Sequence, residues 1–296
     1  MFLILQAIVL GLLQGLTEFL PVSSSGHLQG VPYLLGWESG SLTFDVMVHA
    51  GTLVAVIAYF REDLWWLATR SIGIGAVDGA EQRRARRVVM LLAVGTLPAA
   101  VAGVAFESTF EAAFNSPRAV SLFLYITAAL LVVAERIRRK RAAATIGKPV
   151  ADLVGSEGQL DPGRREDTVT LRDAAVIGAA QAFAIFPGVS RAGSTIAAGM
   201  LLGLSRAAAA RFSFLLSVPI IVGVTIAKLP DLGTAEPGTL PFGSVEIAAG
   251  VIAAAASGYW AIRFLLRLVQ TDDLIGFARY VAVFATLLLA GTFMIG

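Results

Sequence analysis

The chain has 296 residues, of which 56% are apolar and only 15% are charged, and its mean hydropathy is +0.76. Soluble domains carry about 25% charged residues, so this composition excludes an ordinary soluble protein and indicates a polytopic membrane protein. The chain has no cysteine, which excludes disulfides and thiolate metal sites, and its net charge is only +2 with no nucleic-acid-binding patch.

Membrane-spanning helices are predicted where an apolar stretch approaches the roughly 20 residues needed to cross a bilayer. In chain order, the predicted spans are 44–60, 88–106, 118–135, 212–229, 245–269 and 276–295. The residues between them differ in charge. Segments 80–87 and 136–171 are basic or hydrophilic, whereas 107–117 and 230–244 contain acidic residues and no Lys or Arg. By the positive-inside rule the first pair is cytoplasmic and the second pair external.

Two further apolar stretches are interrupted, and they resemble each other. Residues 1–20 run into Pro21 and a run of serines, and residues 172–186 run into Pro187. GLLQGLTEFLPVSSSG begins at Gly11 and GAAQAFAIFPGVSRAG begins at Gly178, with Gly, Gln, Phe, Val, Ser and Gly at matching places. Such self-similarity indicates an internal repeat, with segment 136–171 as a flexible cytoplasmic linker between the halves 1–135 and 172–296.

The repeat predicts the architecture. Each half is one interrupted segment followed by three spans, and because three is odd the halves start on opposite sides of the membrane. We therefore predict an all-α polytopic membrane protein of two inverted-topology repeats, each a re-entrant helix hairpin plus three transmembrane helices, as in transporters. The hairpins are expected at about 1–40 and about 172–204. Irregular backbone is tolerated at membrane depth only beside protein or water, so the tips should meet near the midplane.

Polar residues concentrate at both predicted tips. Gln14 and Glu18 are four residues apart, on one face of the first helix. The other polar or flexible residues are Ser23, Ser24, Ser25 and His27 at the first tip, and Gly188, Ser190, Arg191, Gly193, Ser194 and Thr195 at the second. Hydroxyls, a guanidinium and N–H groups at a helix N-terminus suit an oxyanion such as phosphate, and ionisable residues inside a membrane indicate function.

Each feature also has a structural interpretation. Glu18 and Arg191 could form an ion pair that only holds the hairpins together, and the serines could simply cap helices. His49 lies at the head of a span without polar neighbours in sequence, so it is interpreted as a packed histidine. The functional interpretation rests on the occurrence of these groups together at matched places in two repeats.

The first motif, Gln14-x-x-x-Glu18 followed by FLPVSSSGH ending at His27, resembles the first signature of the bacterial undecaprenyl-diphosphate phosphatase, or bacitracin-resistance, family. The second motif, PGVSRAGST at 187–195, resembles its second signature, and the resemblance extends over essentially the whole chain, including FSFLLSVP at 212–219. It implies a plasma-membrane enzyme, with its site facing outward, that hydrolyses undecaprenyl diphosphate to undecaprenyl phosphate and inorganic phosphate. This activity recycles the lipid carrier for peptidoglycan synthesis and gives bacitracin resistance.

The matched positions suggest roles. The expected catalytic residues are Glu18, His27, Ser24 and Arg191, and the expected substrate-binding residues are Gln14, Ser23, Ser190, Thr195 and Gly188. A magnesium or calcium ion is expected, with Glu18 as its protein ligand. Two positions bear on these roles: Gln14 occupies a place where the family has Glu or Gln, which removes one carboxylate, and Ala192 stands where the family usually has Ser. The nucleophile, water or Ser24, stays open.

The expected partners are a polyprenyl diphosphate lipid and the bilayer, without nucleic acid, and a homodimer stays open. The alternative function is a transporter or flippase of polyprenyl phosphates, because inverted repeats and broken helices fit it directly. SSSGH also resembles an element of the type 2 phosphatidic-acid phosphatases. That family needs a histidine where this chain has Ala197, and a Lys-x6-Arg-Pro element that does not occur, so it is rejected.

Overall fold

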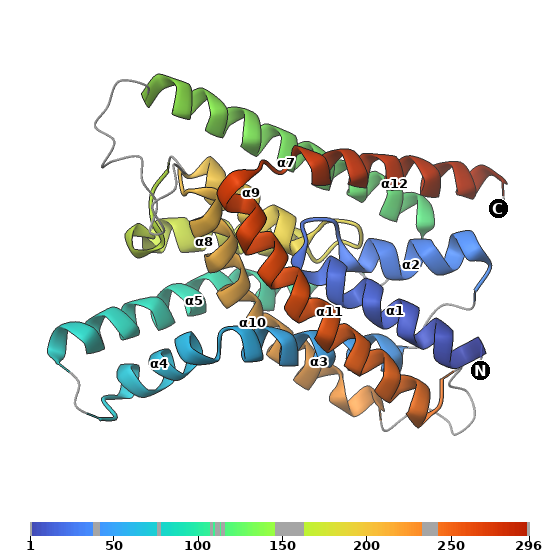
Figure 1. Ribbon diagram of the computed structural model, residues 1–296, viewed down its shortest axis with the longest axis horizontal. Helices are drawn as coiled ribbons and strands as arrows, with labels where there is room; N and C mark the ends of the chain where they lie inside the picture. Colours follow the sequence, from blue (N-terminus) through green and yellow to red (C-terminus); the bar gives the residue numbers. More distant parts are fainter. Residues whose placement is uncertain are drawn as a thin grey trace.

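The structure is a computed structural model, and it describes residues 2–37, 42–75, 78–106, 109, 113, 116–145, 163–232 and 242–294. These residues are helical apart from turns and one isolated β-bridge between Arg164 and Leu204 (Figure 1). The helices are α1 (Phe2–Phe19), α2 (Ser24–Leu35), α3 (Leu42–Tyr59), α4 (Arg61–Ile72), α5 (Gly79–Ala105), α7 (Pro117–Thr145), the 3-10 helix η2 (Glu166–Thr168), α8 (Leu171–Phe183), α9 (Arg191–Leu201), α10 (Arg206–Leu232), α11 (Ser244–Thr271) and α12 (Ile275–Met294).

Six helices in the described residues are long and apolar enough to cross a membrane, namely α1, α5, α7, α10, α11 and α12. The predicted polytopic all-α membrane protein is confirmed. The predicted spans 88–106, 118–135, 212–229, 245–269 and 276–295 fall on α5, α7, α10, α11 and α12, although residue 295 lies outside the described residues. Most of the predicted external segments 107–117 and 230–244 also lies outside them.

The first half differs from the prediction in two details. Helix α1, expected as one short arm of a hairpin, is 18 residues long and qualifies as a span by itself. The predicted span 44–60 is α3, and a bend of 75° separates it from α4, which the sequence did not predict. Charged residues explain the bend, because Arg61, Glu62 and Asp63 open α4 and do not suit continuation into an apolar layer.

The expected flexible linker 136–171 is partly ordered. Helix α7 continues to Thr145, because the Arg, Lys and Ala residues after 135 are strong helix formers. Residues 146–162 lie outside the described residues. Arg164 then anchors the end of the segment: its N–H donates to the Gly203 carbonyl at 2.7 Å, and its guanidinium lies 2.7 Å from the Asp173 carboxylate. Residues 136–145 of the predicted linker are therefore helical, and residues 163–171 are held against α8 and the end of α9.

Both interrupted segments form helix–turn–helix units, α1–α2 and α8–α9. Serine N-caps begin the second helix of each unit: the Ser23 side chain accepts a hydrogen bond from the Gly26 N–H, and that of Ser190 accepts one from the Gly193 N–H. A capping hydroxyl satisfies one of the N–H groups that a helix N-terminus leaves without a partner. The serines at the two tips are thus the local cause of the helix starts.

Glycines allow the first helix of each unit to approach a helix of the other half. A Cβ atom on Gly11 of α1 would lie 2.2 Å from the Gly250 carbonyl oxygen of α11. A Cβ atom on Gly178 of α8 would lie 2.5 Å from the Gly95 carbonyl oxygen of α5. Small residues permit such close backbone contact between membrane helices, and this contact fixes the depth of each hairpin tip.

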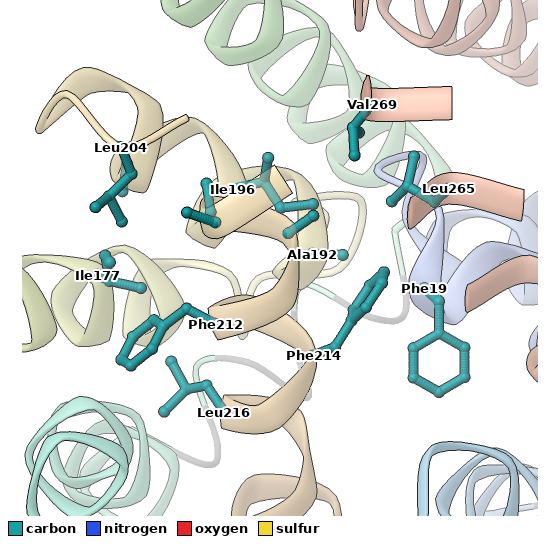
Figure 2. Packing of buried hydrophobic residues seen from close by; sticks show 14 of the residues in the cluster. Phe19, Ile177, Ala192, Ile196, Leu204, Phe212, Phe214, Leu216, Leu265 and Val269 are labelled. Atoms are coloured by element: carbon teal, nitrogen blue, oxygen red, sulfur yellow. The ribbon is translucent and has the colours of Figure 1, made fainter. Parts of the chain in front are cut away.

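The largest buried apolar cluster surrounds α9. Figure 2 shows Ala192 and Ile196 of α9 near Phe212 and Phe214 of α10, with Phe19 and Leu265 on the other side. The rings of Phe19 and Phe214 meet edge to face, with centroids 5.7 Å apart. Residues 192–200 are all buried. The helix is therefore enclosed, and its first residue, Arg191, is held at a defined place beside the end of α1.

We expect Gly11→Ala to lower the free energy of unfolding by about 1–3 kcal/mol, because the added methyl group would overlap the backbone of α11. Gly223→Ala in α10 is the matched control, since a Cβ atom there has no neighbour within 4 Å. Thermal unfolding of both purified variants in detergent measures the difference. Equal unfolding temperatures for the two variants would contradict this account of the α1–α11 contact.

Candidate active site at the hairpin tips

An ion pair joins the two hairpin tips. Glu18, near the end of α1, accepts a hydrogen bond at Oε1 from Nη2 of Arg191, the first residue of α9, at 2.7 Å. Only 8% of the Glu18 side chain and 14% of the Arg191 side chain are exposed. A second contact lies beside it, where the Gly188 N–H donates to Ser25 Oγ at 3.2 Å. The tips of the two units therefore meet, as predicted.

The other carboxylate oxygen of Glu18 accepts further hydrogen bonds. Its Oε2 accepts the Ser24 hydroxyl at 2.7 Å and the Gln14 side-chain amide at 3.2 Å. Four of the residues expected at the site, Gln14, Glu18, Ser24 and Arg191, are thus in one connected group. A carboxylate that receives a serine O–H on one oxygen and a guanidinium on the other is held as an anion, and it lies within reach of the serine proton.

Backbone strain accompanies the placement of Ser24. The preceding residue, Ser23, has φ of 74°, and it is the non-glycine residue with positive φ in the described part of the chain. Such a conformation costs on the order of 1–3 kcal/mol and is frequent at functional sites. The Ser23 carbonyl is meanwhile held by the ring of His27 at 2.7 Å. This turn is therefore maintained by its surroundings, and it orients the Ser24 hydroxyl toward Glu18.

His27, one of the expected catalytic residues, does not join this group. A carbonyl oxygen can only accept, so His27 Nδ1 carries the hydrogen that is donated to the Ser23 carbonyl. Nε2 then accepts the hydroxyl of Tyr280 at 2.8 Å, and the ring stacks on Phe284 with centroids 4.2 Å apart. Both ring nitrogens are occupied, and the contacts with Tyr280 and Phe284 join α2 to α12.

His49, rather than His27, lies beside Glu18. From the sequence it is interpreted as a packed histidine, but the structure places its Nε2 3.8 Å from Glu18 Oε2. Its Nδ1 lies 2.7 Å from the Asp45 carbonyl and therefore carries a hydrogen. In the neutral ring Nε2 is then the nitrogen without a hydrogen, and it lies beside the Glu18 carboxylate.

The second tip is supported by α7 and α10. Thr127 of α7 donates its hydroxyl to the Gly188 carbonyl and accepts the Ser190 N–H, both at 2.9 Å. Gly188 has φ of 95°, and a Cβ atom there would lie 2.4 Å from the Val120 carbonyl oxygen. The hydroxyl of Thr195 contacts the Arg191 carbonyl at 2.8 Å and Ser213 Oγ at 2.6 Å. Gly188, Ser190 and Thr195 thus shape the loop that carries Arg191.

The described residues include no group of three or more His, Asp or Glu side chains that could hold a metal ion. The carboxylate expected as the ligand, Glu18, already accepts hydrogen bonds from Arg191 and Ser24. Protein ligands alone therefore do not form a cation cage here. Magnesium, which commonly takes one carboxylate plus substrate phosphates and waters, is compatible with such a site.

Several residues of the site were not found from the sequence. His49 carried a usable signal, because it is an ionisable residue in a predicted membrane span. The same criterion selected Glu18. Thr127, Ser213 and Tyr280 carried none, since hydroxyl side chains that bond within apolar helices are common. Their importance follows from tertiary contacts with the tips and not from a local motif.

These features define a polytopic membrane protein with an anion-binding candidate site between two helix hairpins. A family model described as "Bacitracin resistance protein BacA" matches residues 7–287. The chain is 41% identical over 290 residues to a protein named undecaprenyl-diphosphatase from Moorella thermoacetica, with 97% of each chain covered. Proteins of the same name from Geobacter sulfurreducens and Methanobrevibacter smithii are 42% and 37% identical, with 94% and 98% of each chain covered. The chain belongs to the BacA family.

We expect Arg191→Ala to lower the free energy of unfolding by about 3–5 kcal/mol, because it leaves the buried Glu18 carboxylate without its charged partner. The double variant Glu18→Gln/Arg191→Ala should recover part of this loss, since no uncompensated charge remains. A double-mutant cycle on unfolding in detergent measures the coupling. Strict additivity of the two changes would show that the pair is not coupled.

Proposed function

We propose that this chain is an undecaprenyl-diphosphatase, which hydrolyses undecaprenyl diphosphate to undecaprenyl phosphate and inorganic phosphate. This reaction recycles the lipid carrier for peptidoglycan synthesis and confers bacitracin resistance. Family membership over residues 7–287 and the names of the relatives support it. The observation that carries the proposal is the Ser24–Glu18–Arg191 group, which places a hydroxyl, a base and a phosphate-binding cation together inside an apolar helix bundle.

Charge neutralisation favours the diphosphate as ligand. Arg191 uses Nη2 for Glu18 and Nη1 for the Ser213 carbonyl, so donors of its guanidinium are left for a phosphate oxygen. The N-termini of α2 and α9, which begin at Ser24 and Arg191, add partial positive charge at the same place. The isoprenoid tail can stay in lipid while the head group lies between the tips.

In the first step we propose that Ser24 Oγ attacks the terminal phosphorus, and the bond from that phosphorus to the bridging oxygen breaks. Undecaprenyl phosphate leaves, and the Ser24 proton passes to Glu18 Oε2, which already accepts that hydroxyl. Phosphoryl transfer requires mainly positioning and charge stabilisation. Arg191 would stabilise the charge on the transferred group.

In the second step a water attacks the phosphoserine, and the phosphorus–Oγ bond breaks to release inorganic phosphate. Glu18 returns its proton to Ser24 Oγ, and His49 Nε2 accepts the proton of the water and later returns it to solvent. The Nε2 of His49, which carries no hydrogen in the neutral ring, and its 3.8 Å separation from Glu18 support this role. The occupied nitrogens of His27 favour a positioning role for that residue.

A magnesium or calcium ion fits this proposal if Glu18 supplies one ligand and the diphosphate and waters supply the rest. When bound, it would add positive charge near the phosphate oxygens of the departing undecaprenyl phosphate. In this proposal the diphosphate itself supplies part of the coordination of the cation.

We also infer that the two halves are inverted repeats. Equivalent residues perform equivalent roles: Ser23 and Ser190 are the N-caps, and Gly11 and Gly178 pack on a helix of the other half. Gln14 and Gln181 each leave a buried Oε1 without a partner in the described residues. The two chain ends lie at one end of the molecule, opposite the basic ends of α5 and α7 (Figure 1). If those basic ends are cytoplasmic, α1–α2 opens to the outside of the plasma membrane.

Phosphate release by the purified chain from undecaprenyl diphosphate in detergent tests the proposed function. We expect Glu18→Gln and Arg191→Ala to lower kcat by at least about 10²-fold. Glu62→Gln, an exposed carboxylate whose side chain is 85% exposed, should retain activity. A chelator should lower the wild-type rate if a cation is bound. Binding of the lipid by wild type without phosphate release under any cation would favour a transporter and refute the enzyme.

The amount of trapped phosphoserine intermediate distinguishes the roles proposed for His27 and His49. In acid-quenched reactions, His49→Gln should accumulate phosphoserine because the second step lacks its base, while the amide can still donate to the Asp45 carbonyl. His27→Gln should lose stability but gain no phosphoserine, and Ser24→Ala should form none. Mass spectrometry of Ser24 provides the readout. Equal, low phosphorylation in both histidine variants would contradict the role assigned to His49.

A further inference from the structure

A second basic site lies away from the hairpin tips, between α7 and α12, which run side by side (Figure 1). A cavity of about 450 Å³ opens there, and its lining includes Arg136 and Arg139 of α7 and Arg279 of α12. We propose that this cavity binds a phosphate group, and its position at the membrane boundary favours the head group of an anionic phospholipid as the source. None of its lining residues belongs to the group around Glu18.

The charges at this cavity do not cancel. Glu135 is fully buried and is already bound by Arg206, at 2.6 and 3.0 Å, and by Arg138 at 3.1 Å. Asp273 is paired with Arg139. Arg136 and Arg279 are both exposed, and neither forms a hydrogen bond or an ion pair with another residue in the described part of the chain. Two uncompensated guanidinium groups therefore line one cavity, on two different helices.

The start of α12 adds donors to the same cavity. Its first residue, Ile275, donates its N–H to Asp273 Oδ1 at 2.9 Å, and the next residue, Gly276, also lines the cavity. A Cβ atom on Gly276 would have no neighbour within 4 Å, so the first turn is open. N–H groups in the first turn have no partner within the helix and favour phosphate. Together with two guanidiniums they form a site of the kind that phosphate esters occupy.

The position of the cavity along α7 and α12 indicates which phosphate-bearing molecule it would bind. The cavity lies where the apolar part of α7 ends in RIRRKR and where the span of α12 begins, and it includes the apolar residues Val132 and Ile275. By the positive-inside rule this boundary is cytoplasmic. Basic cavities between membrane helices at this level bind anionic lipid head groups, and apolar walls beside the arginines suit acyl chains.

Thermal unfolding of the full chain in detergent, titrated with phosphatidylglycerol, phosphatidylcholine or inorganic phosphate, tests the proposal. For wild type we expect phosphatidylglycerol, but not phosphatidylcholine, to raise the unfolding temperature. Arg136→Gln/Arg279→Gln should require a concentration at least about tenfold higher for the same shift, because two charge-assisted contacts are lost. Arg83→Gln/Arg172→Gln, which removes two exposed arginines near the starts of α5 and α8, is the charge-matched control and should behave like wild type.

The outcomes distinguish a lipid head group from free phosphate as the ligand, and they show which result would overturn the proposal. A shift caused by inorganic phosphate alone, lost in the double variant, would support the site and assign it to free phosphate. An equal lipid response in wild type and the double variant, or an equal response to both lipids, would overturn the proposal. Both arginines are exposed and unpaired, so the double variant should fold, and its unfolding temperature without lipid verifies this. The binding readout does not depend on catalysis and stands apart from the phosphatase assay.

Discussion

The contact between Glu18 and Arg191 is the constraint on which the rest of the site depends. A charge buried in an apolar helix bundle is costly unless it is paired and hydrogen-bonded, and these two residues are 173 positions apart in sequence. Each lies at the tip of a helix–turn–helix unit. Glycine contacts position α1 and α8 against helices of the other half, and α9 is enclosed by its neighbours. Together these features bring the Glu18 carboxylate and the Arg191 guanidinium into contact.

The same local construction is used at both tips, and it creates the chemistry of the site. A serine caps each second helix and a short turn reverses the chain, so two helix N-termini lie near one carboxylate. Their N–H groups favour an anion, whereas a carboxylate alone would repel one. The ion pair offsets the charge of Glu18 but leaves donors on Arg191 and a proton acceptor beside Ser24. A site that accepts a diphosphate and activates a hydroxyl needs this combination.

The two histidines show how surroundings assign roles to identical side chains. His27 and His49 both donate Nδ1–H to the carbonyl of the residue four positions earlier. The difference lies at Nε2, which meets the Tyr280 hydroxyl in one case and the Glu18 carboxylate in the other. The first nitrogen is engaged by a hydroxyl, whereas the second lies 3.8 Å from a carboxylate oxygen. Only the second is therefore next to the group around Glu18.

Hydropathy, helix breaks and polar residues in apolar surroundings are local signals, so the membrane helices, the two interrupted segments and the group Gln14, Glu18, Ser24 and Arg191 could be predicted from the sequence. The position of His49 rather than His27 beside Glu18, the bend before α4 and the continuation of α7 past residue 135 became visible only in the folded chain. The physical reason is that the direction of a ring nitrogen depends on contacts between α2 and α12 and between α1 and α3, which no local pattern records.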